Sequence, residues 1–147
     1  MGINFKRTNM KKIFSTCSNN NVNQLWLLIF RVLLSAFFLT HGMGKLNMLL
    51  EGNGAQFPDP FGIGNNLSLI LAVLGEVVAP VLIILGLGTR LAVIPAIVTM
   101  VVAVFMVHGS DPFQKKEMGL LYLLGFLTIL IFGPGRFSFD ALFGRKK

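Results

Sequence analysis

The sequence predicts an all-α fold, a four-helix transmembrane bundle with both termini in the cytoplasm. Two features of composition favour this class: 54% of the 147 residues are hydrophobic and only 13% are charged, and the mean hydropathy is +0.73. Soluble domains carry about 25% charged residues. In addition, the apolar residues form long continuous runs, whereas a transmembrane β-barrel would show alternating segments of roughly ten residues.

Residues 1–24 are expected to form a basic cytoplasmic tail that contains Lys6, Arg7, Lys11 and Lys12. Apolar side chains between these charges are typical of a helix that lies on an anionic leaflet. An unstructured basic tail is the alternative, and the sequence leaves both open.

The transmembrane domain is expected over residues 25–135, with helices at about 25–43, 67–87, 90–107 and 118–132. Each run approaches the roughly 17 to 25 residues that cross a hydrocarbon core. Segment 51–66 is rich in Gly, Pro and Asn and predicts a loop, while 86–89 predicts a tight hairpin. Pro80 and Pro95 predict kinks that neighbouring helices tolerate. Residues 136–147 then form a basic cytoplasmic tail.

The distribution of Lys and Arg predicts the orientation. Four spans would place both tails and the 86–90 hairpin on one side, and most of the basic residues are in these segments. The opposite side would carry only Lys45, Lys115 and Lys116, so the positive-inside rule places both termini in the cytoplasm. The net charge of +7 therefore indicates that the basic residues interact with the lipid bilayer and not with nucleic acid. The single cysteine, Cys17, excludes an internal disulfide and a thiolate metal site within one chain.

Ionisable residues interrupt the apolar runs and indicate two candidate sites, because a charge in hydrocarbon is costly and usually functional. The predicted orientation brings four of them to the external level of the membrane: His41, Lys45, His108 and Glu117. Deeper in the bundle, an Arg31–Glu76 ion pair would lower the insertion cost of both groups. The alternatives are ordinary interfacial polarity for the first site and a purely structural role for the second.

Two histidines at one level could bind a b-type haem, since imidazole is a usual axial ligand. The sequence argues against haem, because it has no further histidine and no Cys-x-x-Cys-His motif. We expect no metal site.

Several short motifs, in this order, resemble the DoxX family (DoxX/DoxD-like small bacterial inner-membrane proteins). They are Arg31, His41-Gly42 with Lys45-Leu46, Gly75-Glu76, the segment 86–90, His108, Glu117, Gly133-Pro134-Gly135, Ser138 and Asp140. The external loop has Gly62-Ile63-Gly64 where the family commonly has Gly-Ile-Pro. The resemblance implies a multi-pass protein of the bacterial inner membrane, similar to the membrane subunit of a thiosulfate:quinone oxidoreductase, with quinone as cofactor.

Together the polar cluster and the resemblance predict the membrane subunit of a redox system that acts on a small substrate, for which the resemblance implies quinone as the cofactor and leaves a sulfur compound as one option for the substrate. The expected catalytic residues are Glu76, Arg31, His41 and His108, and the expected substrate-binding residues are Lys45, Glu117 and Arg90. A soluble or membrane redox protein and further copies of the chain are the expected partners. The alternatives are a non-catalytic scaffold or assembly partner and a small transporter, so whether the chain is an enzyme stays open.

Overall fold

The computed structural model describes residues 20–143, whose regular elements are all helical, with no strand among them. The predicted basic N-terminal tail, apart from its last five residues, and the final four residues of the chain lie outside this range. The elements in chain order are α2 (Asn20–Leu50), η1 (Gly54–Gln56), α3 (Asn65–Val73), η2 (Leu74–Val78), α4 (Ala79–Leu85), α5 (Thr89–Val102), η3 (Ala103–Val107), α6 (Phe113–Phe132) and α7 (Phe139–Phe143).

The first helix, α2, is longer than its apolar run. It begins five residues before the predicted span and continues through Lys45 to Leu50. The chain leaves the helix around Gly52, whose positive φ of 72° is readily adopted only by glycine. Because α2 continues beyond the apolar run, Lys45 lies on a regular helix and not in a loop.

The loop after α2 is held by one carboxylate. Asp59 accepts hydrogen bonds from the backbone N–H groups of Ile63 and Gly64, at 3.1 and 2.7 Å, and from the Ser68 hydroxyl at 2.8 Å. Gly64, with φ of 103°, precedes the first residue of α3. Asp59 therefore ties the Gly-Ile-Gly segment to the start of the second helix.

The second helix contains a π-helical turn. Segments α3, η2 and α4 form one continuous helix, Asn65–Leu85, in which Leu74–Val78 has π geometry and the N–H of Ala79 bonds to the carbonyl of Leu74. Pro80 explains the change of geometry, because proline has no N–H to offer the carbonyl of residue 76, four positions earlier. The kink expected at Pro80 is therefore expressed as a π turn.

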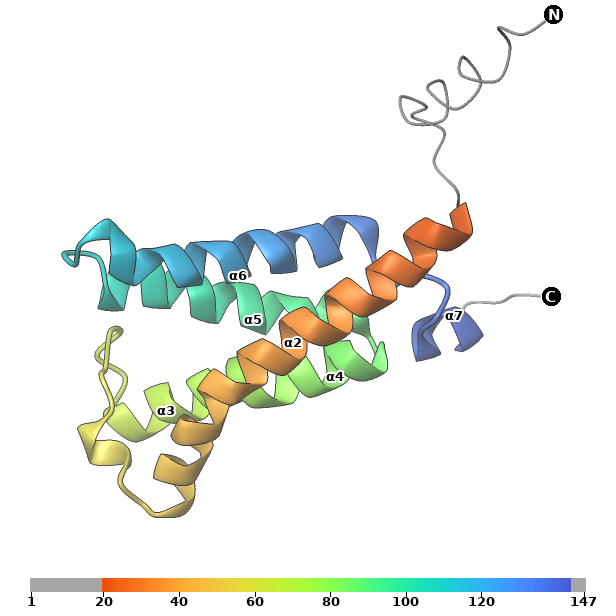
Figure 1. Cartoon of the computed structure of the whole chain (residues 1–147). Helices are drawn as coiled ribbons and strands as arrows, with labels where there is room; N and C mark the ends of the chain where they lie inside the picture. The colour runs from red at the N-terminus through yellow and green to blue at the C-terminus, as the bar shows by residue number, and fades with distance from the viewer. Residues whose placement is uncertain (1–19, 144–147) are drawn as a thin grey trace, which may run out of the picture.

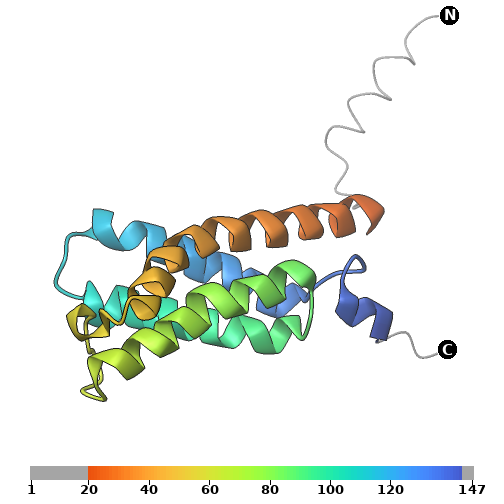
Figure 2. The ribbon, with the colours of Figure 1, turned by 90° about the horizontal axis from the view of Figure 1, so that it is seen from below.

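The α4–α5 hairpin and helix α6 complete the bundle. The hairpin turns at Gly86 and Gly88, which both have left-handed conformations. Figures 1 and 2 show α5 and α6 side by side along their length, and in Figure 1 α2 crosses the bundle diagonally. The start of α2, the hairpin and α7 lie at one end of the bundle, while the 51–64 loop and the 109–112 turn lie at the other (Figure 1).

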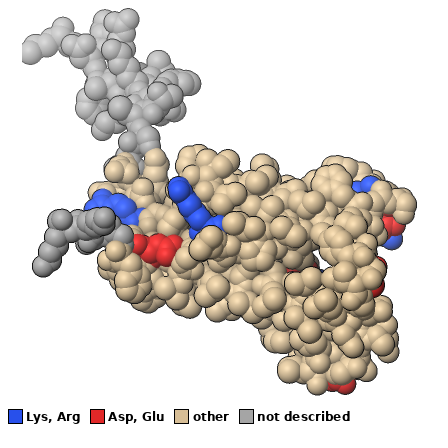
Figure 3. All heavy atoms as spheres, turned by 180° about the vertical axis from the view of Figure 1, so that it is seen from behind, with Lys and Arg blue, Asp and Glu red and all other residues tan. Residues whose placement is uncertain are grey.

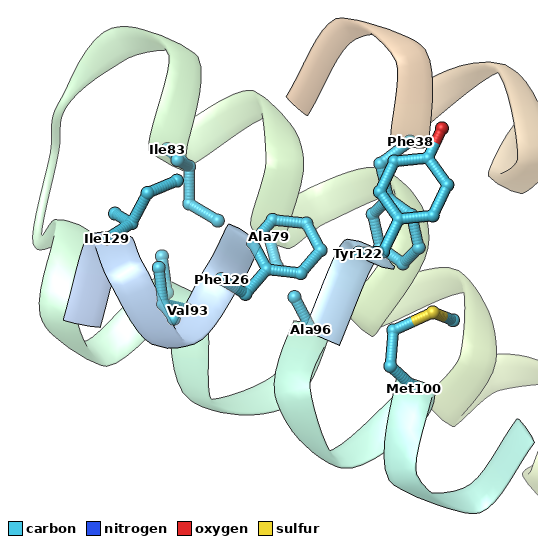
Figure 4. Close-up of a cluster of buried hydrophobic side chains, with 10 residues drawn as sticks. Phe38, Ala79, Ile83, Val93, Ala96, Met100, Tyr122, Phe126 and Ile129 are labelled. Atoms are coloured by element: carbon cyan, nitrogen blue, oxygen red, sulfur yellow. The ribbon is translucent and has the colours of Figure 1, made fainter. Parts of the chain in front are cut away.

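An aromatic cluster joins the helices inside the bundle. The ring of Phe38 lies 5.0 Å from that of Tyr122 and 4.9 Å from that of Phe126, measured between centroids. The remaining core residues are mostly small or aliphatic: Ala79, Ile83, Ala92, Val93, Ala96, Met100 and Ile129. Figure 4 shows how residues of α2, α4, α5 and α6 meet in this cluster, with the Tyr122 hydroxyl pointing away from it.

In the part of the chain that the structure describes, three helices are long and apolar enough to cross a membrane: Asn20–Leu50, Asn65–Leu85 and Thr89–Val107. Large apolar side chains remain exposed along the bundle, including Phe37 (60%), Leu91 (75%) and Ile131 (69%). Outward-facing apolar residues of this kind are what a lipid environment requires. Helix α6 differs from the other three because Lys115, Lys116 and Glu117 are in its first turns, which leaves an apolar run of about 22 Å at 1.5 Å per residue.

Candidate functional site

A cavity of about 220 Å³ lies between α2, η2, α5, η3 and α6. Its polar lining contains His41, Lys45, Glu76, His108 and Tyr122, with Lys115 and Lys116 also contributing. The apolar lining is formed by Phe38, Met100, Ala103, Val104, Met118 and Gly119. We call this site the Lys45–Glu76 cavity. It belongs to the end of the bundle that carries the 109–112 turn.

An ion pair between Lys45 and Glu76 forms part of the cavity wall. The Lys45 ammonium donates a hydrogen bond to Oε2 of Glu76. The Glu76 side chain is only 3% exposed, whereas that of Lys45 is 29% exposed. The pair thus holds a buried carboxylate against a cation that reaches the cavity surface, and its net charge is zero.

The π turn and a glycine on α2 place Glu76 beside Lys45. Glu76 lies in the middle of the Leu74–Val78 turn. A Cβ atom at Gly42 would overlap the carbonyl oxygen of Glu76, so the absence of a side chain lets α2 approach this turn closely. Lys45 lies one turn further along α2. The short distance between the two helices therefore brings the lysine within reach of the carboxylate.

A second π turn leads to His108. Segment η3 (Ala103–Val107) has π geometry, and the N–H of His108 bonds to the carbonyl of Ala103 at 2.9 Å. The His108 Nδ1 atom lies 2.8 Å from Oδ2 of Asp111, and the Lys115 ammonium lies 3.6 Å from the same oxygen. The hydrogen bond to His108 is the main cause that lowers the pKa of Asp111 below its ordinary value. Both π turns therefore border the cavity, which is notable because such turns are frequent at functional sites.

His41 and Tyr122 face each other at the cavity. Their ring centroids are 5.6 Å apart in an edge-to-face arrangement. Tyr122 is not among the site residues predicted from the sequence, although it is the only tyrosine in the chain. A lone phenol within an apolar helix is the signal that could have identified it, because a buried Tyr hydroxyl usually serves a polar contact.

The predicted Arg31–Glu76 ion pair is not formed. Arg31 is 2% exposed, but its Nη2 atom donates a hydrogen bond to the carbonyl oxygen of Phe137 at 2.8 Å. Glu76 is paired with Lys45 instead. The prediction was wrong because it compared only the depths of the two groups, whereas the rotation of α2 and the length of each side chain decide the partner.

Two further predicted site residues lie outside the cavity. Glu117 is exposed on the first turns of α6 and does not line the cavity. Arg90 is exposed at the start of α5, at the opposite end of the bundle. The structure thus gathers His41, Lys45, His108 and Glu76, and it separates them from Arg31, Arg90 and Glu117.

The arrangement can bind a small ligand and exchange protons with it. Lys45 offers a hydrogen-bond donor, the imidazoles can donate or accept, and a Tyr hydroxyl can do either. Phe38, Met100 and Tyr122 provide apolar and aromatic surface. Within residues 20–143, no group of three His, Cys, Asp or Glu side chains could hold a metal ion.

Comparisons with known proteins agree with this architecture. The sequence model of the DoxX family matches residues 26–109. A Haemophilus influenzae protein described as uncharacterized is 31% identical over 132 residues, which cover 82% of this chain and 92% of that protein. A second uncharacterized H. influenzae protein is 28% identical over 123 residues, or 79% of this chain and 82% of the relative. No solved structure matches. The family match spans more than half of the chain, from α2 to the end of η3, and shows that this membrane protein belongs to the DoxX family.

Proposed function

We propose that the protein is the membrane subunit of a quinone-linked redox system and that the Lys45–Glu76 cavity binds the quinone head group. The supporting observation is the ion pair in the cavity wall, which holds a carboxylate that is only 3% exposed. Burying this charge is costly, and inside a membrane such a cost generally accompanies a function.

The lining residues fit a quinone head group, which has a flat apolar ring and two carbonyl oxygens that accept hydrogen bonds. Phe38, Met100 and Tyr122 provide apolar surface for the ring. The Lys45 ammonium and the imidazole of His41 or His108 are the donors for the oxygens. A bound quinone would supply a redox couple of two electrons and two protons, with the electrons coming from a small reduced substrate, for which we expect a sulfur compound.

The residues of the chain would bind the ligand and exchange its protons. Lys45 shares a hydrogen bond with Glu76, so a proton can be held between these two groups. An imidazole can accept a proton on one ring nitrogen and donate one from the other, so His41 and His108 are suited to accept or return a proton. Asp111, beside His108 at 2.8 Å, links that imidazole to the polar turn at the end of the bundle.

The proposal includes a topology with four spans in the bacterial inner membrane. Helix α6 lies antiparallel to α5 (Figure 2) and would form a short fourth crossing, with its charged first turns in the external head-group layer. Both termini would then be cytoplasmic, as the distribution of Lys and Arg predicts. The cavity would open toward the external side of the membrane. Redox partner proteins or further copies of the chain would bind the outer surface of the bundle.

Extraction of the gently purified protein, followed by mass spectrometry for quinones, tests the proposal. We expect quinone in wild-type protein, quinone-dependent oxidation of a reduced sulfur donor, and loss of both in E76Q and K45M. E51Q is the matched control, because Glu51 is an exposed carboxylate that does not line the cavity. Wild-type protein that carries no quinone and shows no quinone-dependent turnover would refute the proposal. Protein that carries no quinone but is purified together with a partner protein would favour the scaffold alternative.

A further inference from the structure

The segment after α6 folds back across the end of the bundle. The N–H of Asp140 donates a hydrogen bond to the carbonyl of Gly86 at 2.9 Å. The two carboxylate oxygens of Asp140 accept hydrogen bonds from the N–H groups of Gly88 and Thr89, at 2.6 and 2.8 Å. Arg31 binds the carbonyl of Phe137 from inside the bundle. Residues 137–140 are therefore fixed to the α4–α5 hairpin and to α2.

This anchored segment presents apolar side chains on its outer face. Phe137 is 55% exposed, Phe139 46%, Leu142 65% and Phe143 80%. The inward contacts of the segment are made by its backbone, by Asp140 and by Ser138, which is 8% exposed and lies against Gly86, whereas the large apolar groups remain exposed. Four such residues within a short stretch form an apolar surface that the bundle itself does not cover.

Basic side chains accompany this apolar surface. Arg90 and Arg136 are both exposed, and the chain continues after Phe143 with the basic residues Arg145, Lys146 and Lys147. Figure 3 shows basic patches beside an acidic patch at the end of the molecule that carries the start of α2 and α7. Asp140 is the one carboxylate of the segment and keeps its negative charge, but the two exposed arginines outnumber it, so the net charge of this surface is positive.

The surface lies at the level where the membrane-crossing helices end. Helix α4 ends at Leu85, α5 begins at Thr89, and α6 ends at Phe132. Because Asp140 binds the hairpin between α4 and α5, the segment lies at the ends of these helices and not beside their apolar middles. This level corresponds to the boundary between acyl chains and head groups, where aromatic and basic side chains are favoured.

We propose that Arg90, Arg136, Phe137, Phe139, Leu142 and Phe143 form a docking surface for an anionic lipid leaflet, which we call the C-terminal lipid face. The arginines bind lipid phosphate groups, and the apolar side chains insert just below the head groups. Arg31 and Asp140 are positioning residues, because they fix the orientation of the segment without touching lipid. This assignment gives Arg31 a role that is separate from the cavity.

A fluorescent probe placed in the segment tests where the surface lies. Trp26, the only tryptophan, is 62% exposed and can be replaced by phenylalanine, so that the indole introduced by F139W is the sole one in W26F/F139W. In vesicles of phosphatidylcholine and phosphatidylglycerol, we expect the fluorescence of this variant to be quenched by lipids brominated near the glycerol and to be shielded from aqueous iodide. Ready quenching by iodide, with no effect of brominated lipid, would show that the face is exposed to water and would overturn the proposal.

The retention of anionic lipid tests the charge requirement. We expect R90Q/R136Q to retain less phosphatidylglycerol than wild type in native mass spectrometry, with affinity falling about fivefold for each arginine removed. R90K/R136K should restore retention, because it preserves the charge. K115Q/K116Q, with the same loss of charge at the opposite end of the bundle, is the matched control. An equal loss of bound phosphatidylglycerol in R90Q/R136Q and K115Q/K116Q, or no loss in R90Q/R136Q, would contradict the proposed C-terminal lipid face.

Discussion

Separating the Lys45–Glu76 pair should destabilise the protein unequally, depending on which partner is removed. In K45M the Glu76 carboxylate loses its partner while its side chain stays 3% exposed. In E76Q the Lys45 ammonium loses its counter-charge, but its side chain is 29% exposed and can be hydrated from the cavity. The lysine variant should therefore be the less stable of the two.

The burial of each group sets the magnitude. Removing one partner of a buried pair typically costs about 3–5 kcal/mol, because the remaining charge is left without compensation. We expect this range for K45M and about 1–2 kcal/mol for E76Q, whose amide can still accept a hydrogen bond from Lys45. The double variant K45M/E76Q leaves no unpaired charge at this site and should recover at least about 2 kcal/mol relative to the sum of the single variants.

Unfolding in mild detergent by added dodecyl sulfate, or by heat, measures these differences in a double-mutant cycle. K45M should lower the unfolding midpoint by between about 6 and 20 °C. K115M is the control, because the Lys115 side chain is 65% exposed and lies 3.6 Å from the Asp111 carboxylate, and it should cost less than about 1 kcal/mol. Additive single effects of less than about 1 kcal/mol each would refute the conclusion that the two residues form a buried pair.

Two further predictions concern the close helix contact and the C-terminal anchor. Gly42→Ala should cost about 1–3 kcal/mol and reduce ligand binding, because the new Cβ would overlap the Glu76 carbonyl. Gly44→Ala, where the added Cβ would meet no atom of the neighbouring helices within 4 Å, should gain about 0.5–1 kcal/mol, and equal effects of the two substitutions would contradict this contact. Asp140 should make stability depend on pH in acid. Burial acts to raise its pKa, but hydrogen bonds from Thr89 and Gly88 and the charge of Arg31 outweigh burial and lower it. A lowered pKa in the folded state adds stability above about pH 4 that is lost as the pH falls further. Thermal melts of D140N between about pH 5 and 3 should therefore show a smaller decline than those of wild type, and parallel declines would exclude this role of Asp140.

The helical, membrane-embedded character of the protein could be predicted because it depends on composition and on continuous apolar runs. The predicted spans at 67–87 and 90–107 agree closely with Asn65–Leu85 and Thr89–Val107, since glycine pairs and loop residues mark their ends. The span at 25–43 was too short, because α2 continues through polar residues to Leu50. Hydropathy locates the apolar part of a helix, whereas hydrogen bonding decides where the helix ends.

The sequence by itself determined that ionisable groups are buried among apolar helices, and Arg31 and Glu76 are indeed 2% exposed. Only the tertiary structure decided which groups meet. The π turn before Pro80 rotates Glu76, and Gly42 admits its backbone close to α2, so Lys45 becomes its partner. Arg31 instead binds a carbonyl that lies 106 positions later in the chain. Pairing between helices depends on their rotation and separation, and these follow from the packing of all the helices together.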